Sequence, residues 1–193
     1  MPHKQQPASV GAYHYAANKE IFEPQRGNNF DFIIDKSLNG IGAYGSDSKK
    51  FPNAQEYIRL SVKSTSVPHF SQNVIEVKRG NTTTKYAGTI SFDGGRLECY
   101  DFIGAETKDI LMAWQAKSGN PLFQTVGVQA DYKVDCRLLE YSPDYDQLVR
   151  TWVLNGCWIS GMREDDFNVD SNGTRAITLD IQYDRAYPDY SAE

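Results

Sequence analysis

The sequence predicts a mainly β fold: an antiparallel β-sandwich or half-open barrel with one α-helix packed outside. Several segments alternate apolar and polar residues with a period of two, which is typical of half-buried strands. The most regular of them are residues 131–138 and 177–184. A single segment, within residues 101–118, has the spacing of an amphipathic helix. The chain has 193 residues, enough for one hydrophobic core and few for two.

The chain begins with a polar stretch, residues 1–29, that contains three prolines. This composition predicts an N-terminal arm with little regular structure, and the sequence leaves open whether it is a disordered tail or an ordered contact arm. Residues 30–193 are expected to form a single β domain. Its first strand is predicted at residues 30–34, and residues 37–53, rich in glycine and serine, are predicted to be a long loop.

The next strands are expected at residues 58–63, 74–79 and 86–92, where apolar residues again alternate with polar ones. Pro68 ends the first of these strands in a turn. The segment Asp93-Gly94-Gly95 ends the last one, because these residues tolerate positive φ.

The predicted helix places Ile103, Ile110, Leu111 and Trp114 on one apolar face. Either Asp101 or Thr107 is a candidate N-cap residue. Gly119 suits the C′ position of this helix and Pro121 prevents its continuation.

The last third returns to strands. Residues 149–158 are apolar on both faces, which predicts a strand covered on both sides. Asn172-Gly173 is interpreted as a hairpin turn, because the segment lacks the glutamate that a calcium loop of this kind requires. About seven or eight strands result.

The residues that could carry catalysis give no enzyme site. His3, His14 and His69 have no metal-ligand spacing, and the sequence has no nucleophile elbow, phosphate loop or dinucleotide fingerprint. Cys99, Cys136 and Cys157 form no CxxC pair, so we interpret them as buried thiols. Packing in the core is also the better interpretation of the tryptophans, which are Trp114, Trp152 and Trp158. We therefore expect no enzyme activity, no metal and no cofactor.

The charge is unevenly placed along the chain. The net charge is −5, and residues 130–193 hold 6 basic and 13 acidic residues. This balance argues against a surface that binds duplex DNA, which needs clustered lysine and arginine. The sequence shows neither an apolar run of membrane-spanning length nor a signal peptide, so we expect folding in a cytoplasm and no stable membrane association.

Several short sequence motifs occur in a characteristic order between residues 57 and 188. A strand leads to Val67-Pro68, the helix ends in Trp114-Gln115, and the last third contains residues 131–133, 152–156 and 177–184. In this order the chain resembles the inner tail-tube proteins of contractile-tailed bacteriophages. None of these motifs is a catalytic signature.

The resemblance implies a structural virion protein. Members of this family form hexameric rings, and the rings stack into the hollow inner tube of a contractile tail. The tube passes DNA into the host without binding it stably. The implied partners are other copies of the chain, the tail sheath protein, and the baseplate and tail-terminator proteins. The implied location is the virion tail, assembled in the cytoplasm of a host bacterium.

The resemblance also suggests which residues to examine. Acidic residues that repel phosphates would suit the tube lumen, and the outward positions of the last strands offer Asp131, Asp135, Asp180 and Asp184. An ordinary solvent-facing role is the alternative for these residues. The loop at residues 37–53 is a candidate contact between successive rings, through Gly40, Gly42, Tyr44, Gly45 and Asp47.

Three other functions stay open. A tube-initiating baseplate protein and the tube of a bacterial secretion system share this fold. A carbohydrate-binding β-sandwich, with exposed tryptophans as platforms, belongs to a different class and would neither form rings nor stack.

Overall fold

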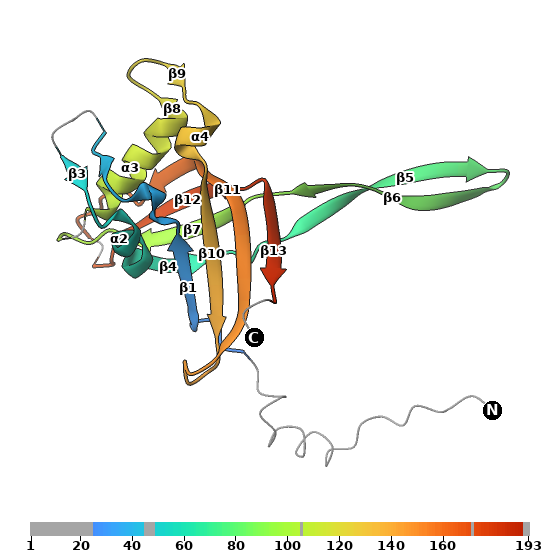
Figure 1. The fold of residues 1–193 in the computed structure, drawn as a ribbon, viewed down its shortest axis with the longest axis horizontal. Coiled ribbons are helices and arrows are strands. Elements are labelled where there is room, and N and C mark those ends of the chain that lie inside the picture. Colours follow the sequence, from blue (N-terminus) through green and yellow to red (C-terminus); the bar gives the residue numbers. More distant parts are fainter. Residues whose placement is uncertain (1–24, 45–48, 105, 171, 191–193) are drawn as a thin grey trace, which may run out of the picture.

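The computed structural model describes residues 25–44, 49–104, 106–170 and 172–190, and Figure 1 shows their arrangement. The described strands are β1 (Phe30–Ile34), β2 (Ile41–Gly42), β3 (Lys50–Phe51), β4 (Val62–Thr65), β5 (Phe70–Arg79), β6 (Thr82–Phe92), β7 (Gly95–Tyr100), β8 (Gly119–Asn120), β9 (Thr125–Val126), β10 (Val134–Tyr141), β11 (Leu148–Glu164), β12 (Ala176–Gln182) and β13 (Arg185–Asp189). The described helices are α2 (Ala54–Ser61), α3 (Thr107–Ser118), α4 (Gln129–Tyr132) and the 3₁₀ helix η2 (Lys36–Leu38).

Seven antiparallel strands form the main sheet, in the order β1-β10-β11-β12-β7-β4, with β13 also paired to β11. The long strand β11 joins the two parts of this sheet. Its residues 148–157 pair with β10, whereas its residues 158–164 pair with β12. The outer edges of β1 and β4 do not pair with each other, so the sheet is not closed into a barrel. The predicted mainly β, antiparallel sandwich is confirmed.

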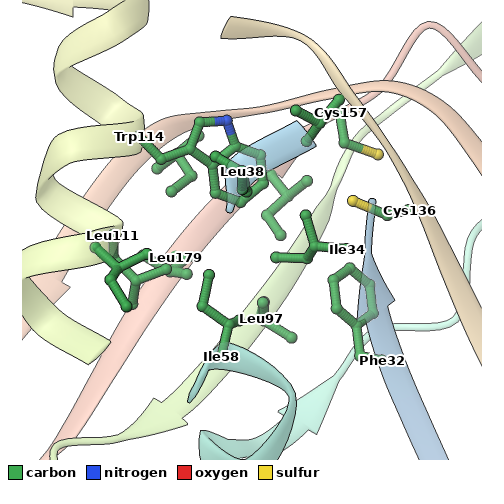
Figure 2. Close-up of a cluster of buried hydrophobic side chains, with 14 of the residues drawn as sticks. Phe32, Ile34, Leu38, Ile58, Leu97, Leu111, Trp114, Cys136, Cys157 and Leu179 are labelled. Atoms are coloured by element: carbon green, nitrogen blue, oxygen red, sulfur yellow. The ribbon is translucent and has the colours of Figure 1, made fainter. Parts of the chain in front are cut away.

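One hydrophobic core lies inside this arrangement (Figure 2). Period-two alternation supplies its sheet residues, for example Phe32 and Ile34 of β1 and Leu179 of β12. Trp114 of α3 and Ile58 of α2 are fully buried against them. Of the described helices, none combines the length and the apolar composition that crossing a membrane requires.

The strand predicted at residues 58–63 is mostly a helix. Residues 54–61 form α2, and its buried residues Ala54, Ile58 and Ser61 follow helical spacing, whereas Leu60 is 67% exposed. Only Val62 and Lys63 of the predicted segment belong to β4. The described residues thus contain three α-helices where the sequence predicted one. Alternation over six residues cannot exclude one and a half turns of an amphipathic helix.

The predicted long helix is confirmed, with corrections at its ends. α3 begins at Thr107, so Ile103 lies outside it and is fully exposed. The N-cap residue is Glu106, so the prediction of Asp101 or Thr107 at this position is wrong. Thr107 is buried in the first turn, where its hydroxyl and the Ser61 hydroxyl form a hydrogen bond of 2.7 Å. The helix ends one position earlier than predicted, because Gly119 is its C-cap and not its C′ residue; Gly119 has φ −150° and begins β8.

Four further segments differ from the expectation. Residues 129–132 form the short helix α4, and the strand predicted from Asp131 begins only at Val134. β7 and β13 were not predicted, and β13 is the short continuation of β12 after a turn. The segment at residues 37–53 is not a plain loop, because β2 pairs with β3 and buries Ile41 and Phe51.

Candidate assembly site

The most prominent feature of the surface is the hairpin of β5 and β6, which projects from the body (Figure 1). Every residue of β5 is exposed, and in β6 only Gly88 and Phe92 are even partly covered. Each strand would extend for about 33 Å at the usual rise of about 3.3 Å per residue. A two-stranded ribbon alone in water is marginally stable at best, so this hairpin is suited to contact with another molecule.

The outer part of the hairpin, residues 74–87, is called the distal hairpin below. Its cross-strand register gives it two different faces. Ile75 pairs with Tyr86 and Val77 pairs with Thr84, so one face carries three large apolar side chains. The other face carries Glu76 opposite Lys85, whose charged groups are 3.2 Å apart. A face with this apolar content would be half-buried in an ordinary sheet, yet here it is exposed.

A bulge in β6 separates the distal hairpin from its base. The register shifts between the pairs Gln72↔Ile90 and Val74↔Ala87, which leaves one extra residue in β6. Gly88 lies at this point, and a Cβ there would come within 2.6 Å of the Asn73 carbonyl oxygen. The base is anchored by Phe92, whose ring contacts those of Phe70 and Tyr183 at centroid distances of 6.3 and 6.0 Å.

The sheet offers further edges to a neighbour. Among the described strands, β1 pairs only with β10, β4 only with β7, and β13 only with β11. A groove of about 560 Å³ lies where β1 and β4 diverge. Both of its carboxylates pair with arginines, since Arg59 Nε donates to Asp31 at 2.7 Å and Arg150 lies 3.6 Å from Glu140. Unpaired strand edges beside carboxylates that already have partners suit pairing with another chain better than binding of a small cation.

The four acidic lumen candidates lie in different settings. Asp135, in β10, accepts a hydrogen bond from the Gly156 backbone N–H at 3.0 Å. Asp184 binds Lys133 Nζ at 2.7 Å, and this hydrogen bond raises the pKa of Lys133. The structure thus brings Asp135 and Asp184 together around Gly156, which has φ +68°.

The two other lumen candidates lie apart from that pair. Asp180 is in β12, half-buried and 3.7 Å from Arg163, whereas Asp131 is exposed in α4. The predicted strand positions of Asp131 and Asp184 are wrong, because Asp131 is helical and Asp184 lies in the turn between β12 and β13. The pairing around Gly156 depends on strand register, so no local sequence signal could have revealed it. A lumen role for the four residues stays a prediction.

The candidate inter-ring residues are only partly described. Gly40 has φ +82° and forms the turn before β2, where Gly42 pairs with Lys50. Tyr44 is half-buried and lines a second groove with Trp158. Gly45 and Asp47 lie outside the described residues, as do residues 1–24 of the predicted arm. The described end of that arm is anchored, since Asn29 Nδ2 donates to the Ser142 carbonyl at 2.8 Å.

The described residues hold no group of three or more potential metal ligands, and none of their buried side-chain nitrogen or oxygen atoms lacks a hydrogen-bond partner.

The predicted burial of Trp114 is confirmed, and its indole N–H donates to the Tyr132 carbonyl at 2.9 Å. Trp152 and Trp158 are only half-buried, and Trp158 contacts Tyr132 edge to face. Asn172-Gly173 lies within the longer β11–β12 connection, so the prediction of a tight hairpin turn there is wrong.

All three cysteines are buried, as predicted, and should resist thiol reagents. Burial raises the pKa of the Cys99 thiol to about 12, and burial together with the hydrogen bond to Cys157 raises the pKa of Cys136. Because the thiolate is the reactive form, we expect the cysteines of the native chain at pH 8 to be modified roughly 100-fold more slowly than those of the chain unfolded in urea. A time course with a chromogenic disulfide reagent measures this. Rapid modification of any cysteine in the folded chain would contradict the burial.

These features describe a mainly β fold with an extended hairpin and open sheet edges. No protein-family model matches the sequence, and no curated protein matches it. Solved structures, however, share the fold. The chain is similar to the tube-terminating cap of the anti-feeding prophage, with a TM-score of 0.60 and 14% identity over 86% of this chain and 91% of the cap chain.

Two chains of PVC, an extracellular contractile injection system, are also similar. One comes from the sheath/tube terminator in the extended state, with a TM-score of 0.61 and 17% identity over 86% of this chain and 97% of that one. The other comes from the sheath–tube complex, with a TM-score of 0.60 and 17% identity over 94% and 99% of the two chains. The chain therefore has the fold found in tube and terminator assemblies of contractile injection systems.

Proposed function

We propose that this chain is a structural subunit of the inner tube of a contractile phage tail. Copies close into hexameric rings, and the rings stack into a hollow conduit for DNA inside a sheath. The observation that carries this proposal is the exposed β5–β6 hairpin, on a fold shared with tube assemblies. Contact with neighbouring copies would cover its apolar face and pair the open edges of β1, β4 and β13.

The test is the assembly state of the purified protein. Negative-stain electron microscopy and light scattering should show six-fold rings and, at high concentration, stacked tubes with a central channel. A protein that stays monomeric at high concentration and is absent from tail particles contradicts the proposal.

The likeness to two terminator chains favours a second candidate function, that of a tube terminator. A terminator closes into one ring and does not polymerise. Rings that never stack, even at high concentration, would therefore favour the terminator over the tube.

The lumen prediction can be tested in assembled tails. Lysine at Asp131, Asp135, Asp180 and Asp184 would attract DNA phosphates where the native carboxylates repel them, so DNA release should slow by roughly tenfold if these residues line the channel. Release is followed by the fluorescence of a DNA-binding dye after ejection is triggered. Asparagine at the same positions is the matched control, because it adds no positive charge. Native kinetics in the lysine variants would place these residues outside the lumen.

A further inference from the structure

The tip of the hairpin is both apolar and basic. Its apolar side chains are Ile75, Val77 and Tyr86, which are 52%, 40% and 44% exposed. Lys78 and Arg79 lie beside them at the end of β5, and neither has an ion pair within the described part of the chain. Glu76 is the sole acidic residue of the two strands, and Lys85 is its partner at 3.2 Å. The tip therefore presents uncompensated positive charge next to exposed apolar surface.

A second exposed surface, which we call the acidic end, lies on the side of the body away from the hairpin (Figure 1). It is formed by the β7–α3 and β11–β12 connections. Its apolar side chains are Phe102, Ile103, Phe167 and Val169, of which the last three are almost fully exposed. Its acidic side chains include Asp166 and Asp170, which are exposed and have no ion pair among the described residues.

Arg175 holds the two connections of the acidic end together. Its guanidinium lies 3.1 Å from Asp101, 3.0 Å from Glu164 and 3.9 Å from the centroid of the Phe167 ring. Lys108 binds the same Glu164 carboxylate at 2.7 Å, and Lys108 and Arg175 lower the pKa of Glu164. The exposed Phe167 ring thus lies against an arginine that two ion pairs hold, which favours a docking surface over a loose loop.

We propose that the hairpin tip of one copy docks on the acidic end of the next copy. The two surfaces are complementary, because each has an apolar centre and one carries lysine and arginine where the other carries aspartate. Because the two surfaces differ and lie on opposite sides of the folded molecule, the contact repeats from copy to copy and generates a ring or a stacked array. This inference rests on the proposed function and specifies the surfaces that assembly would use.

Charge reversal tests the contact directly. The variant K78E/R79E makes the tip acidic, and the variant D166K/D170K makes the other end basic. Like charges then face each other in each variant alone, so the concentration needed for assembly should rise at least tenfold. An equal mixture of the two variants should restore assembly, because alternating copies place opposite charges at every contact. The charge-preserving variants K78R/R79K and D166E/D170E are the matched controls and should assemble normally.

Cross-linking identifies the partner surfaces in the wild-type assembly. A carbodiimide should join the amines of Lys78 or Lys85 to the carboxylates of Asp166 or Asp170, and mass spectrometry of mixed light and heavy isotope-labelled chains should show that these links join two chains. Assembly of both reversed variants at the wild-type concentration, without such links, would assign the tip to another partner and overturn the contact while leaving the proposed tube intact. A wild-type chain that forms no assembly overturns the contact together with the proposed function.

Discussion

A chain in which residues 71–91 are replaced by Asn-Gly should fold normally and lose all assembly. The replacement keeps Phe70 and Phe92, which already pair across the hairpin, and joins them by a two-residue turn that suits antiparallel strands. No fully buried side chain is removed, since the deleted part of the hairpin is exposed apart from partly covered Gly88. We therefore expect the free energy of unfolding to change by less than about 1 kcal/mol.

Two measurements separate folding from assembly in this variant. Urea unfolding followed by circular dichroism reports the stability of the body, and light scattering with negative-stain microscopy reports rings and tubes. A second variant, with serine at Ile75, Val77 and Tyr86, tests the apolar face alone, because it keeps the full length of the hairpin. This variant should also assemble poorly. Normal tubes from the shortened chain would show that the hairpin is not the assembly device.

The hairpin also shows what period-two alternation reports. The sequence predicts strands at residues 74–79 and 86–92, and strands are found there, but the alternation also predicted one buried face. In the isolated chain that face is exposed, with Ile75 and Val77 on it. If the proposed assembly is correct, the alternation records burial against another copy, which no pattern in a single chain can distinguish from burial in its own core.

The parts of the fold that were predicted share a strong and local signal. β1, β10 and β12 alternate over five or more residues with one side in the core, and α3 contains an uninterrupted apolar face ending near proline. Residues 58–61 were misassigned to a strand because a short amphipathic helix also places apolar residues close together. Ile58 is buried and Leu60 exposed only because the chain is helical there.

The arrangement of the acidic residues could not be predicted, because it depends on register. Asp135 reaches the Gly156 N–H since β10 pairs with β11 through a bulge. Asp184, between β12 and β13, reaches Lys133, which lies between α4 and β10 and is 51 positions away in the sequence. Likewise, the acidic end is assembled from residues more than sixty positions apart, through the ion pair between Asp101 and Arg175. The count of charged residues located the acidic third of the chain. Which of its carboxylates have no basic or N–H partner is decided by contacts between residues that are distant in the sequence.

Trp114→Ala should destabilise the chain by about 3–5 kcal/mol, a large share of the roughly 5–15 kcal/mol that holds a typical domain folded. Trp114 is fully buried where α3 meets the sheet (Figure 2), so alanine leaves a cavity that the surrounding strands cannot fill. The substitution also leaves the Tyr132 carbonyl without the indole N–H that donates to it at 2.9 Å. Urea unfolding monitored by far-UV circular dichroism measures the loss.

Two matched variants identify the cause of that loss. Trp114→Phe keeps most of the buried volume and removes the hydrogen bond, so it should cost clearly less than alanine. Leu122→Ala changes a side chain that is 69% exposed and should stay within about 0.5 kcal/mol of wild type. Because α3 also lies next to the acidic end through Lys108, partial unfolding of α3 should weaken assembly as well as stability. A Trp114→Ala chain as stable as the Leu122→Ala chain would show that α3 is not part of the cooperative core.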